Sequence, residues 1–227
     1  MINSTRLSQQ QVYLNLYEGY KGTPMAVSSE SLAHKALRFS QIASIFKDED
    51  DISVHDIGMG IADFYQFLLE KSPGKKISYS GTEILPEFVA ESSNRFPECK
   101  FYLRDVAEQA FDDHYDYVVM SGVFHQRRDS TIPEWERFYQ ELLVNAFSMC
   151  RKGLAFNFIS PFVDFYQTEV YYCNIYKLLN FLTEKLSRFF TIQHNYALFE
   201  FTVFVYKEEF VLEKHPQAEF RKYFKTA

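Results

Sequence analysis

The chain has 227 residues, a length that one hydrophobic core can serve, since single cores rarely grow beyond about 250–300 residues. Its hydrophobic fraction of 47% and charged fraction of 24% are those of a folded protein and exclude general disorder. The net charge of −6, without long Lys/Arg runs, argues against a nucleic-acid partner. No apolar stretch reaches the roughly 18–20 residues that cross a bilayer, so we expect no membrane partner either.

Three cysteines, Cys99, Cys150 and Cys173, stand far apart in the sequence with no CxxC spacing. A disulfide framework or a structural zinc site needs more numerous and more closely spaced ligands, so we expect reduced thiols and no metal. The first ten residues lack the apolar core of a signal peptide. These features together predict a cytoplasmic protein.

Apolar periodicity and helix-breaking residues divide the chain into alternating helices and strands. Residues 1–30 are predicted to form an aromatic arm or lid. The predicted elements of the first half are a helix over 31–46, a strand over 52–57, a helix over 62–71, a strand over 76–82, a helix over 86–96, and strands over 99–103 and 116–121. Those of the second half are a helix over 133–150, a strand over 153–159, a helix over 174–186, and strands over 189–194 and 199–207.

Strand–helix alternation in units of about 25–30 residues is typical of a parallel sheet covered by helices on both faces. The last two strands are joined by a short turn and predict an antiparallel pair. We therefore predict an α/β fold with a mostly parallel seven-stranded sheet and a C-terminal antiparallel strand pair. The domain is expected over 31–207, followed by a charged, aromatic and partly helical tail over 208–227.

Glycines and carboxylates follow the first strands, at the edge where open parallel sheets bind ligands. Gly58 and Gly60 permit a tight turn before the next helix, whose first amides are then open to a ligand. Glu83, after the second strand, is placed to accept hydrogen bonds from ribose hydroxyls. Asp105, after the third strand, is placed to accept one from an exocyclic amine, and Ser121 follows the fourth. Their joint occurrence in this order predicts a nucleoside-binding site.

Two nucleoside cofactors compete for such a site. A nicotinamide dinucleotide favours Gly-x-Gly-x-x-Gly, but Asp63 stands where the third glycine would be. A carboxylate beside a pyrophosphate is repulsive, by about one to several kcal/mol at an effective dielectric constant of about 20. S-adenosylmethionine has no phosphate and carries a cationic amine and a sulfonium. Asp56 and Asp63, which flank the loop, therefore favour S-adenosylmethionine.

The sequence His55-Asp56-Ile57-Gly58-Met59-Gly60 resembles the first motif of class I S-adenosylmethionine-dependent methyltransferases. Further matches to this family are Gly81-Thr82-Glu83-Ile84, Arg104-Asp105-Val106, the segment 115–122 and the terminal hairpin segment 200–206. The resemblance covers about residues 31–207, and the segment 153–158 resembles a subgroup of small bacterial small-molecule methyltransferases. It implies a Rossmann-like fold, S-adenosyl-L-methionine as cofactor and methyl transfer to an oxygen or nitrogen of a small-molecule acceptor.

The resemblance also implies roles at the methionine end of the cofactor. Gly58 and Gly60 would back the methionine part, and Asp56 would orient its amine through the loop. Ser121 would offer its backbone to the same end. Arg38 would pair with the methionine carboxylate.

At the adenosine end, the resemblance implies that Glu83 holds the ribose and that Ile84 lies against the adenine. Asp105, with Val106 next to it, would receive the adenine amine. Two positions depart from the family pattern. Ala62 replaces a frequent glycine and is expected to crowd the start of the next helix. His55 replaces an aliphatic strand residue and needs a buried partner.

Methyl transfer from a sulfonium needs alignment and, for oxygen nucleophiles, a base. His125, in the loop that follows Ser121, is the best-placed candidate base. His34, in the predicted first helix, is the next.

The acceptor pocket is expected to come from the aromatic parts of the chain that the motifs leave unused. Tyr13 and Tyr17 lie in the arm, Tyr166 follows the fifth parallel strand, and Tyr196 lies between the last two strands. Aromatic side chains suit a flat or apolar small molecule. An exposed aromatic arm could instead contact a second subunit, which leaves a homodimer open.

Two other functions remain open at this point. The first is a catalytically silent S-adenosylmethionine-binding partner or scaffold protein. The second is a nicotinamide-dependent reductase, which the carboxylate of Asp63 disfavours.

Overall fold

Seven strands form one sheet in the computed structural model, which describes residues 10–11, 14–15, 18–19 and 31–225. The strands are β1 (Asp51–Ile57), β2 (Lys76–Glu83), β3 (Lys100–Leu103), β4 (Tyr115–Met120), β5 (Cys150–Ile159), β6 (Phe190–Gln193) and β7 (Glu200–Tyr206). Their order is β3-β2-β1-β4-β5-β7-β6. All neighbours pair in parallel except β7, which runs antiparallel to both β5 and β6. The predicted mixed sheet is confirmed.

Helices connect the strands at the predicted places. They are α2 (Leu32–Ala43), α3 (Asp63–Lys71), α4 (Pro86–Arg95), α5 (Ile132–Ser148), α6 (Ile175–Phe181) and α7 (Glu208–Lys214). Three shorter or irregular elements complete the list within the described residues, namely η2 (Ser44–Phe46), η3 (Leu182–Leu186) and η4 (Ala218–Tyr223). Of these, η3 is a π-helical turn that continues α6. Within 31–207, each predicted helix and strand is present with ends within three residues of those predicted.

Local chemistry fixes several helix starts. The hydroxyl of Ser31 accepts a hydrogen bond from the backbone N–H of His34 and caps α2. Thr131 and Glu134 form a reciprocal capping box at the start of α5. Pro86 opens α4, where its missing N–H costs no helical hydrogen bond.

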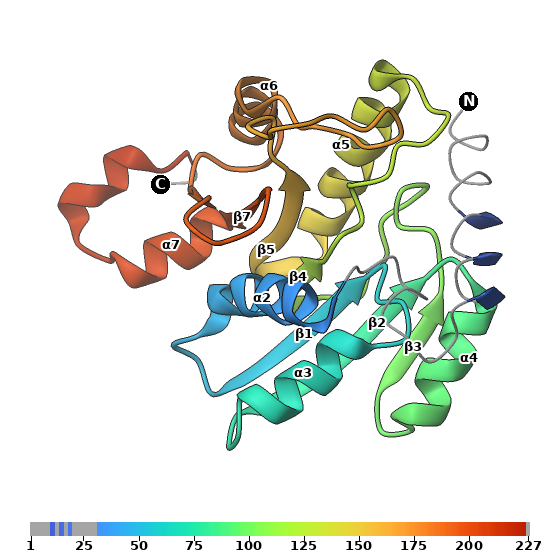
Figure 1. Cartoon of the computed structure of the whole chain (residues 1–227). Coiled ribbons are helices and arrows are strands. Elements are labelled where there is room, and N and C mark those ends of the chain that lie inside the picture. Colours follow the sequence, from blue (N-terminus) through green and yellow to red (C-terminus); the bar gives the residue numbers. More distant parts are fainter. Residues whose placement is uncertain (1–9, 12–13, 16–17, 20–30, 226–227) are drawn as a thin grey trace.

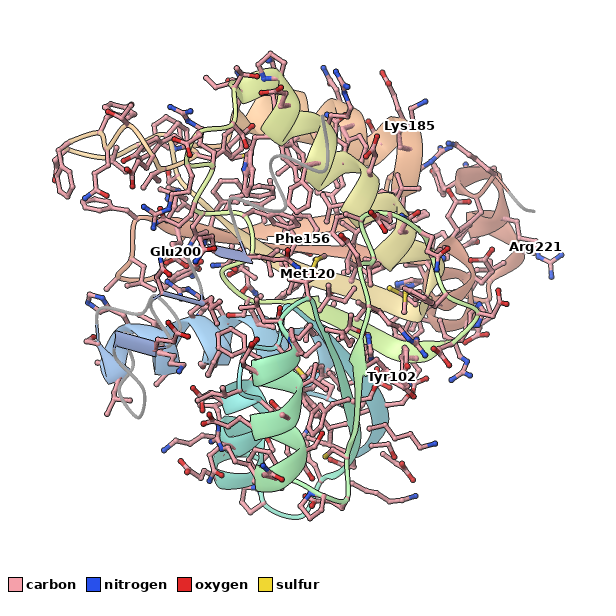
Figure 2. All side chains as sticks on the ribbon, turned by 90° about the vertical axis from the view of Figure 1, so that its right-hand side faces the viewer. Tyr102, Met120, Phe156, Lys185, Glu200 and Arg221 are labelled. Carbon is pink, nitrogen blue, oxygen red and sulfur yellow. The ribbon has the colours of Figure 1, made fainter. Side chains whose placement is uncertain are left out.

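Two apolar layers lie on the two faces of the sheet. Figure 1 shows α2, α3 and α4 gathered on one side and α5 and α6 on the other. The larger core contains the fully buried Met120 and Phe156 beside α5, whereas Lys185 and Arg221 point outward in Figure 2. On the opposite face, Phe210 of α7 is buried against Tyr117 and Tyr206, which joins the C-terminal helix to the sheet. No helix in the described part of the chain has both the length and the apolarity to cross a membrane.

The order of the strands creates the place for a ligand. β1 and β4 are central neighbours, and the chain proceeds from β1 toward β2 and β3 on one side and from β4 toward β5 on the other. Connections therefore leave the carboxyl ends of β1 and β4 in opposite directions and open a crevice between them. The glycine loop after β1 and the loop after β4 border this crevice.

Candidate active site

A cavity lies at the carboxyl ends of β1, β2 and β4, closed on its sides by residues of α2, α3, α4 and α5. The sequence-predicted residues that line it are Arg38, Asp56, Gly58, Gly60, Glu83, Ile84, Asp105, Val106, Ser121 and His125. Residues separated by nearly ninety positions in the sequence thus meet in one space.

The loop after β1 needs its two glycines. Gly58 and Gly60 have φ of +71° and +57°, in the left-handed region. A Cβ on Gly58 would lie 2.8 Å from Cγ2 of Val123, so a side chain there would collide with the loop after β4. Ala62 also has a positive φ, +59°, with its side chain fully buried. The departure at Ala62 is therefore a strained backbone that costs about 1–2 kcal/mol relative to a right-handed residue.

Glu83 connects the ends of β1 and β2. Its carboxylate accepts hydrogen bonds from the backbone N–H groups of Gly60, at 3.1 Å, and Ile84, at 2.7 Å. Burial raises the pKa of Glu83 to about 7 despite these bonds. The side chain is 8% exposed and lines the cavity, so it can accept further hydrogen bonds only from a group inside that cavity.

Asp56 lies at the end of β1 in the same cavity and is 2% exposed. Its carboxylate accepts a hydrogen bond of 2.7 Å from the hydroxyl of Tyr79. Burial raises its pKa to about 7, and the neighbouring charge of Glu83 adds to the rise. Two buried carboxyl groups that share a cavity favour a ligand with cationic or hydrogen-bond-donating groups.

Asp105 and Val106 form the cavity wall after β3. The Asp105 carboxylate accepts a hydrogen bond of 2.9 Å from the N–H of Ala107, which fixes the turn. Val106 is 2% exposed and supplies an apolar surface next to it. The backbone N–H of Arg104 bonds to the carbonyl of Glu83 at 3.1 Å, so the β3 loop is held directly beside the β2 loop.

Two buried polar atoms in the cavity wall have no hydrogen-bond partner among the described residues. They are Oγ of Ser121, at the end of β4, and Nε1 of Trp135, in α5. Buried donors of this kind are normally satisfied, so their position in a cavity wall is an observation in favour of a polar ligand there.

A polar network borders the cavity between the β4 loop and β7. Arg38 donates twice to the carboxylate of Glu200, with Nε at 2.9 Å from Oε2. Asn157 donates through Nδ2 to Glu200 at 2.6 Å and to Nε2 of His125 at 3.0 Å, while its Oδ1 accepts from the N–H of Gly122 at 2.8 Å. Figure 2 shows Glu200 at the end of the sheet beside α2, the helix that carries Arg38. Arg38 is therefore engaged by a carboxylate of the protein itself.

The comparisons with known proteins agree with this architecture. No protein-family model matches the chain. A curated relative from Mycobacterium tuberculosis, named "Putative methyltransferase Rv1506c", is 28% identical over 160 residues, which are 70% of this chain and 95% of the relative.

Solved structures share the fold. The chain matches the DhpI–SAM–HEP complex with a TM-score of 0.63 at 11% identity, over 88% of this chain and 96% of the other. It matches magnesium protoporphyrin IX methyltransferase from Synechocystis with bound SAH with a TM-score of 0.61 at 13% identity, over 87% and 95% of the two chains. The N-methyltransferase NodS from Bradyrhizobium japonicum in complex with SAH gives 0.59 at 10% identity, over 87% and 97%.

The chain has the class I S-adenosylmethionine-dependent methyltransferase fold. This fold confirms the Rossmann-like sheet expected from the sequence motifs and agrees with the resemblance to this family. It also places the glycine loop, Glu83 and Asp105 at the ends of three neighbouring strands.

In this methyltransferase fold, His55 has the buried partners that its strand position requires. Its two ring nitrogens lie 2.8 Å from the hydroxyls of Ser80 and Thr82 on β2, and its ring stacks on Tyr115. Burial, together with the charge of Arg104, lowers its pKa to about 3. His55 is therefore a neutral link between β1 and β2 and lies outside the cavity lining.

Several predicted site residues do not meet at the cavity. His34 is exposed in the first turn of α2. Tyr166 is 67% exposed and bonds to the carbonyl of Pro161, and the hydroxyl of Tyr196 bonds to Thr202 at 2.9 Å. None of these three residues lines the cavity as far as the described chain defines it.

Tyr13 and Tyr17 lie outside the described residues. The part of the arm that is described includes Gln10, whose side-chain amide donates to the carbonyl of Ile84 at 3.1 Å and lines the cavity. The arm therefore contributes to the site through Gln10, a residue that the sequence did not single out.

Asp63 is paired with two cationic side chains in the structure. Lys35 forms an ion pair with Asp63, and Arg95 forms a second one at 2.8 Å. The two cations compensate the negative charge that was expected to repel a pyrophosphate, so this repulsion is smaller than the sequence indicates.

Asn157, Glu200 and Lys35 are site residues that sequence reasoning missed. Asn157 lies inside the apolar strand β5, and Glu200 is the first residue of the apolar strand β7. A polar residue in such an apolar run is the signal that could have found them. Lys35 falls one helical turn from Arg38 on α2 and carries no motif of its own.

Proposed function

We propose that the chain binds S-adenosyl-L-methionine at the ends of β1, β2 and β3 and transfers its methyl group to an oxygen or nitrogen of a small-molecule acceptor. The observation that carries this proposal is the Glu83 carboxylate. It is bonded to the glycine loop at Gly60 and shares one cavity with Asp56, Asp105 and Ser121. The three solved structures named above, which are complexes with SAM or SAH, support the choice of cofactor.

The lining residues fit the adenosine part of this cofactor. Glu83 keeps lone pairs for the two ribose hydroxyls in addition to those used by Gly60 and Ile84. Ile84 and Val106 supply the apolar surfaces for an adenine ring, and Asp105 supplies an acceptor for its amine. Ser121 and Trp135 contribute buried donors that have no hydrogen-bond partner among the described residues.

The bound cofactor would supply an activated methyl group on a sulfonium. The protein's own part is to hold the two reactants in line and to exclude water. The glycine loop, the β4 loop and α5 enclose the cavity from different directions, which suits a small acceptor more than a large polymer. The net charge of −6 also disfavours nucleic acid as acceptor.

Two measurements test the proposal together. Titration calorimetry with S-adenosylmethionine, S-adenosylhomocysteine and NADH should give saturable binding of the first two and none of NADH. Incubation with methyl-labelled S-adenosylmethionine and a panel of small carboxylates, phenols and amines should then give labelled product and S-adenosylhomocysteine. Binding without turnover on any panel member would favour a silent binding protein, and binding of NADH alone would favour a reductase.

A further inference from the structure

We infer that Asn157 is a positioning residue that holds His125 as a hydrogen-bond donor from Nδ1, so that His125 orients the acceptor molecule and does not serve as its base. The inference rests on the proposed function and assigns a role to a side chain that borders its cavity. It implies an acceptor with an oxygen or nitrogen lone pair directed at this N–H.

The orientation of the Asn157 amide follows from its neighbours. One end faces the N–H of Gly122 at 2.8 Å, and the other faces the carboxylate of Glu200 at 2.6 Å. A backbone N–H needs an acceptor and a carboxylate needs a donor, so Oδ1 faces Gly122 and Nδ2 faces Glu200. In the opposite orientation, the amide NH₂ of Asn157 would face the N–H donor of Gly122, and its oxygen would face the carboxylate acceptor of Glu200. Arg38 holds the Glu200 carboxylate in place through two further bonds.

The tautomer of the His125 ring follows from the orientation of the Asn157 amide. Nε2 of His125 lies 3.0 Å from Nδ2 of Asn157, a group that can only donate. Nε2 must therefore present its lone pair, and the ring proton of neutral His125 must be on Nδ1. A proton on Nε2 would point at the Asn157 amide hydrogens, and the nearest carboxylate oxygen, of Glu200, is too far for a hydrogen bond at 4.0 Å. Burial lowers the pKa of His125 to about 4, which keeps the ring neutral near pH 7.

The N–H of Nδ1 is placed for a ligand. His125 lines the cavity, and no hydrogen bond from its Nδ1 is formed within the described part of the chain. A Cβ on Gly122 would lie 4.0 Å from Nδ1 and 3.5 Å from Nη1 of Arg38, so Gly122 leaves open the space between these two groups. A lone-pair atom of the acceptor fits between them.

The chemistry of the methyl transfer is consistent with a hydrogen-bond donor at Nδ1 of His125. The lone pair of the acceptor's nucleophilic atom forms the bond to the methyl carbon, while the electrons of the broken carbon–sulfur bond stay on sulfur. An ionised oxygen or a neutral amine needs no base for this step. Where the nucleophile carries a proton, that proton passes to solvent after the transfer, because Asn157 already occupies the Nε2 lone pair of His125.

The tautomer of His125 can be read directly by long-range ¹H–¹⁵N correlation spectroscopy on the histidine-labelled protein without ligand at pH 7.5. The sequence has six histidines, and the signal missing from His125→Ala assigns the ring. We expect a protonated Nδ1 and an unprotonated Nε2. A protonated Nε2 in the wild-type protein would overturn the inference. Asn157→Asp, whose carboxylate accepts from Nε2, should move the proton to Nε2, and an unchanged spectrum in that variant would also contradict it.

Measurements of activity on substitutions of His125 distinguish a hydrogen-bond donor from a base. The amide nitrogen of His125→Asn falls near the place of Nδ1 and can donate but cannot take a proton. With each acceptor that the labelled-methyl panel identifies, His125→Asn should keep kcat/KM within about tenfold of the wild type, and His125→Ala should lose about 10–100-fold. Equal losses of about 10²–10⁴ in both variants would indicate a base. If no acceptor turns over, the proposed function fails, while the spectrum still decides the tautomer.

Discussion

Glu83 illustrates how one side chain can organise a ligand site. Its backbone ends β2, while its carboxylate reaches the N–H of Gly60 in the loop after β1. The loop is thereby held in the left-handed conformation that is observed at Gly58 and Gly60. A carboxylate used in this way is already desolvated and oriented before a ligand arrives, which lowers the cost of binding ribose hydroxyls.

Replacing Glu83 by Gln should weaken S-adenosylhomocysteine binding by about 1–3 kcal/mol, because an amide accepts fewer hydrogen bonds than a carboxylate and presents a donor to the ribose hydroxyls. Titration calorimetry measures the change. Glu87→Gln, on the exposed side of α4 four positions later, is the matched control and should leave the affinity unchanged. Equal affinities for the wild type and Glu83→Gln would remove Glu83 from the ribose site.

The affinity for the cofactor should also depend on pH. Burial raises the pKa of Glu83 and that of Asp56 to about 7, so both carboxyl groups lose charge as the pH falls below 7. Ionised carboxylates bind hydroxyl donors and cationic groups more tightly, so affinity should rise from pH 6 to pH 8. Calorimetry across this range tests the expectation, and Glu83→Gln should reduce the slope. An affinity that falls toward pH 8 would contradict these assignments.

Single residues differ in how far the sequence could reveal them. Glu83 and Asp105 could be predicted because each directly follows a recognisable strand. Asn157 and Glu200 could not, because their contact depends on the antiparallel register of β5 and β7, in which Asn157 lies opposite Thr202 and Ile159 opposite Glu200. Such a register is a long-range property that strand patterns alone leave open.

At the scale of elements, α2 is held over the site by charged contacts. Arg38 binds Glu200 of β7, and Lys35 binds Asp63 at the start of α3. The helix is therefore attached both to the antiparallel end of the sheet and to the glycine-loop side. Its ends were predictable from Ser31 and the apolar period, whereas these distant ionic partners were not.

Glu200→Gln should destabilise the fold by about 2–3 kcal/mol, because it leaves the largely buried guanidinium of Arg38 without a counter-charge. The double variant Arg38→Met, Glu200→Gln should recover most of that loss, since it removes the uncompensated cation. Urea unfolding measures both. Asp51→Asn, which breaks the exposed Lys76–Asp51 pair, is the control and should cost less than about 0.5 kcal/mol. A double variant that is no more stable than Glu200→Gln would show that the pair does not hold α2.

His55, which links β1 to β2, should make the stability of the fold sensitive to acid. The pKa of His55 is about 3 in the folded protein and about 6.5 when the chain is unfolded, so below pH 6.5 the unfolded state binds the additional proton. Stability is therefore lost as the pH falls from 6.5 toward 3, by about 1 kcal/mol at pH 5.5 relative to pH 7.5. Urea unfolding of the wild type and His55→Gln at these two pH values tests this. A variant with the same acid dependence as the wild type would exclude His55 as the source.

At the scale of the whole molecule, the alternation of strands and helices was sufficient to predict the sheet, because each unit of 25–30 residues is one crossover. The strand order β3-β2-β1-β4-β5-β7-β6 comes from the structure, because right-handed crossovers are compatible with more than one order. The acceptor region was not predictable in the same way. Tyr166 and Tyr196 belong to connections whose paths depend on packing, and they lie away from the cavity, whereas Gln10 of the arm reaches it.

The account depends on one arrangement, in which an adenosyl group lies across the ends of β1, β2 and β3. A crystal structure of the protein grown with S-adenosylhomocysteine tests it most directly. We predict ribose hydroxyls within hydrogen-bond distance of the Glu83 carboxylate, and the adenine amine at Asp105 between Ile84 and Val106. Density for the ligand elsewhere, with Glu83 and Asp105 contacting only protein, would contradict the account.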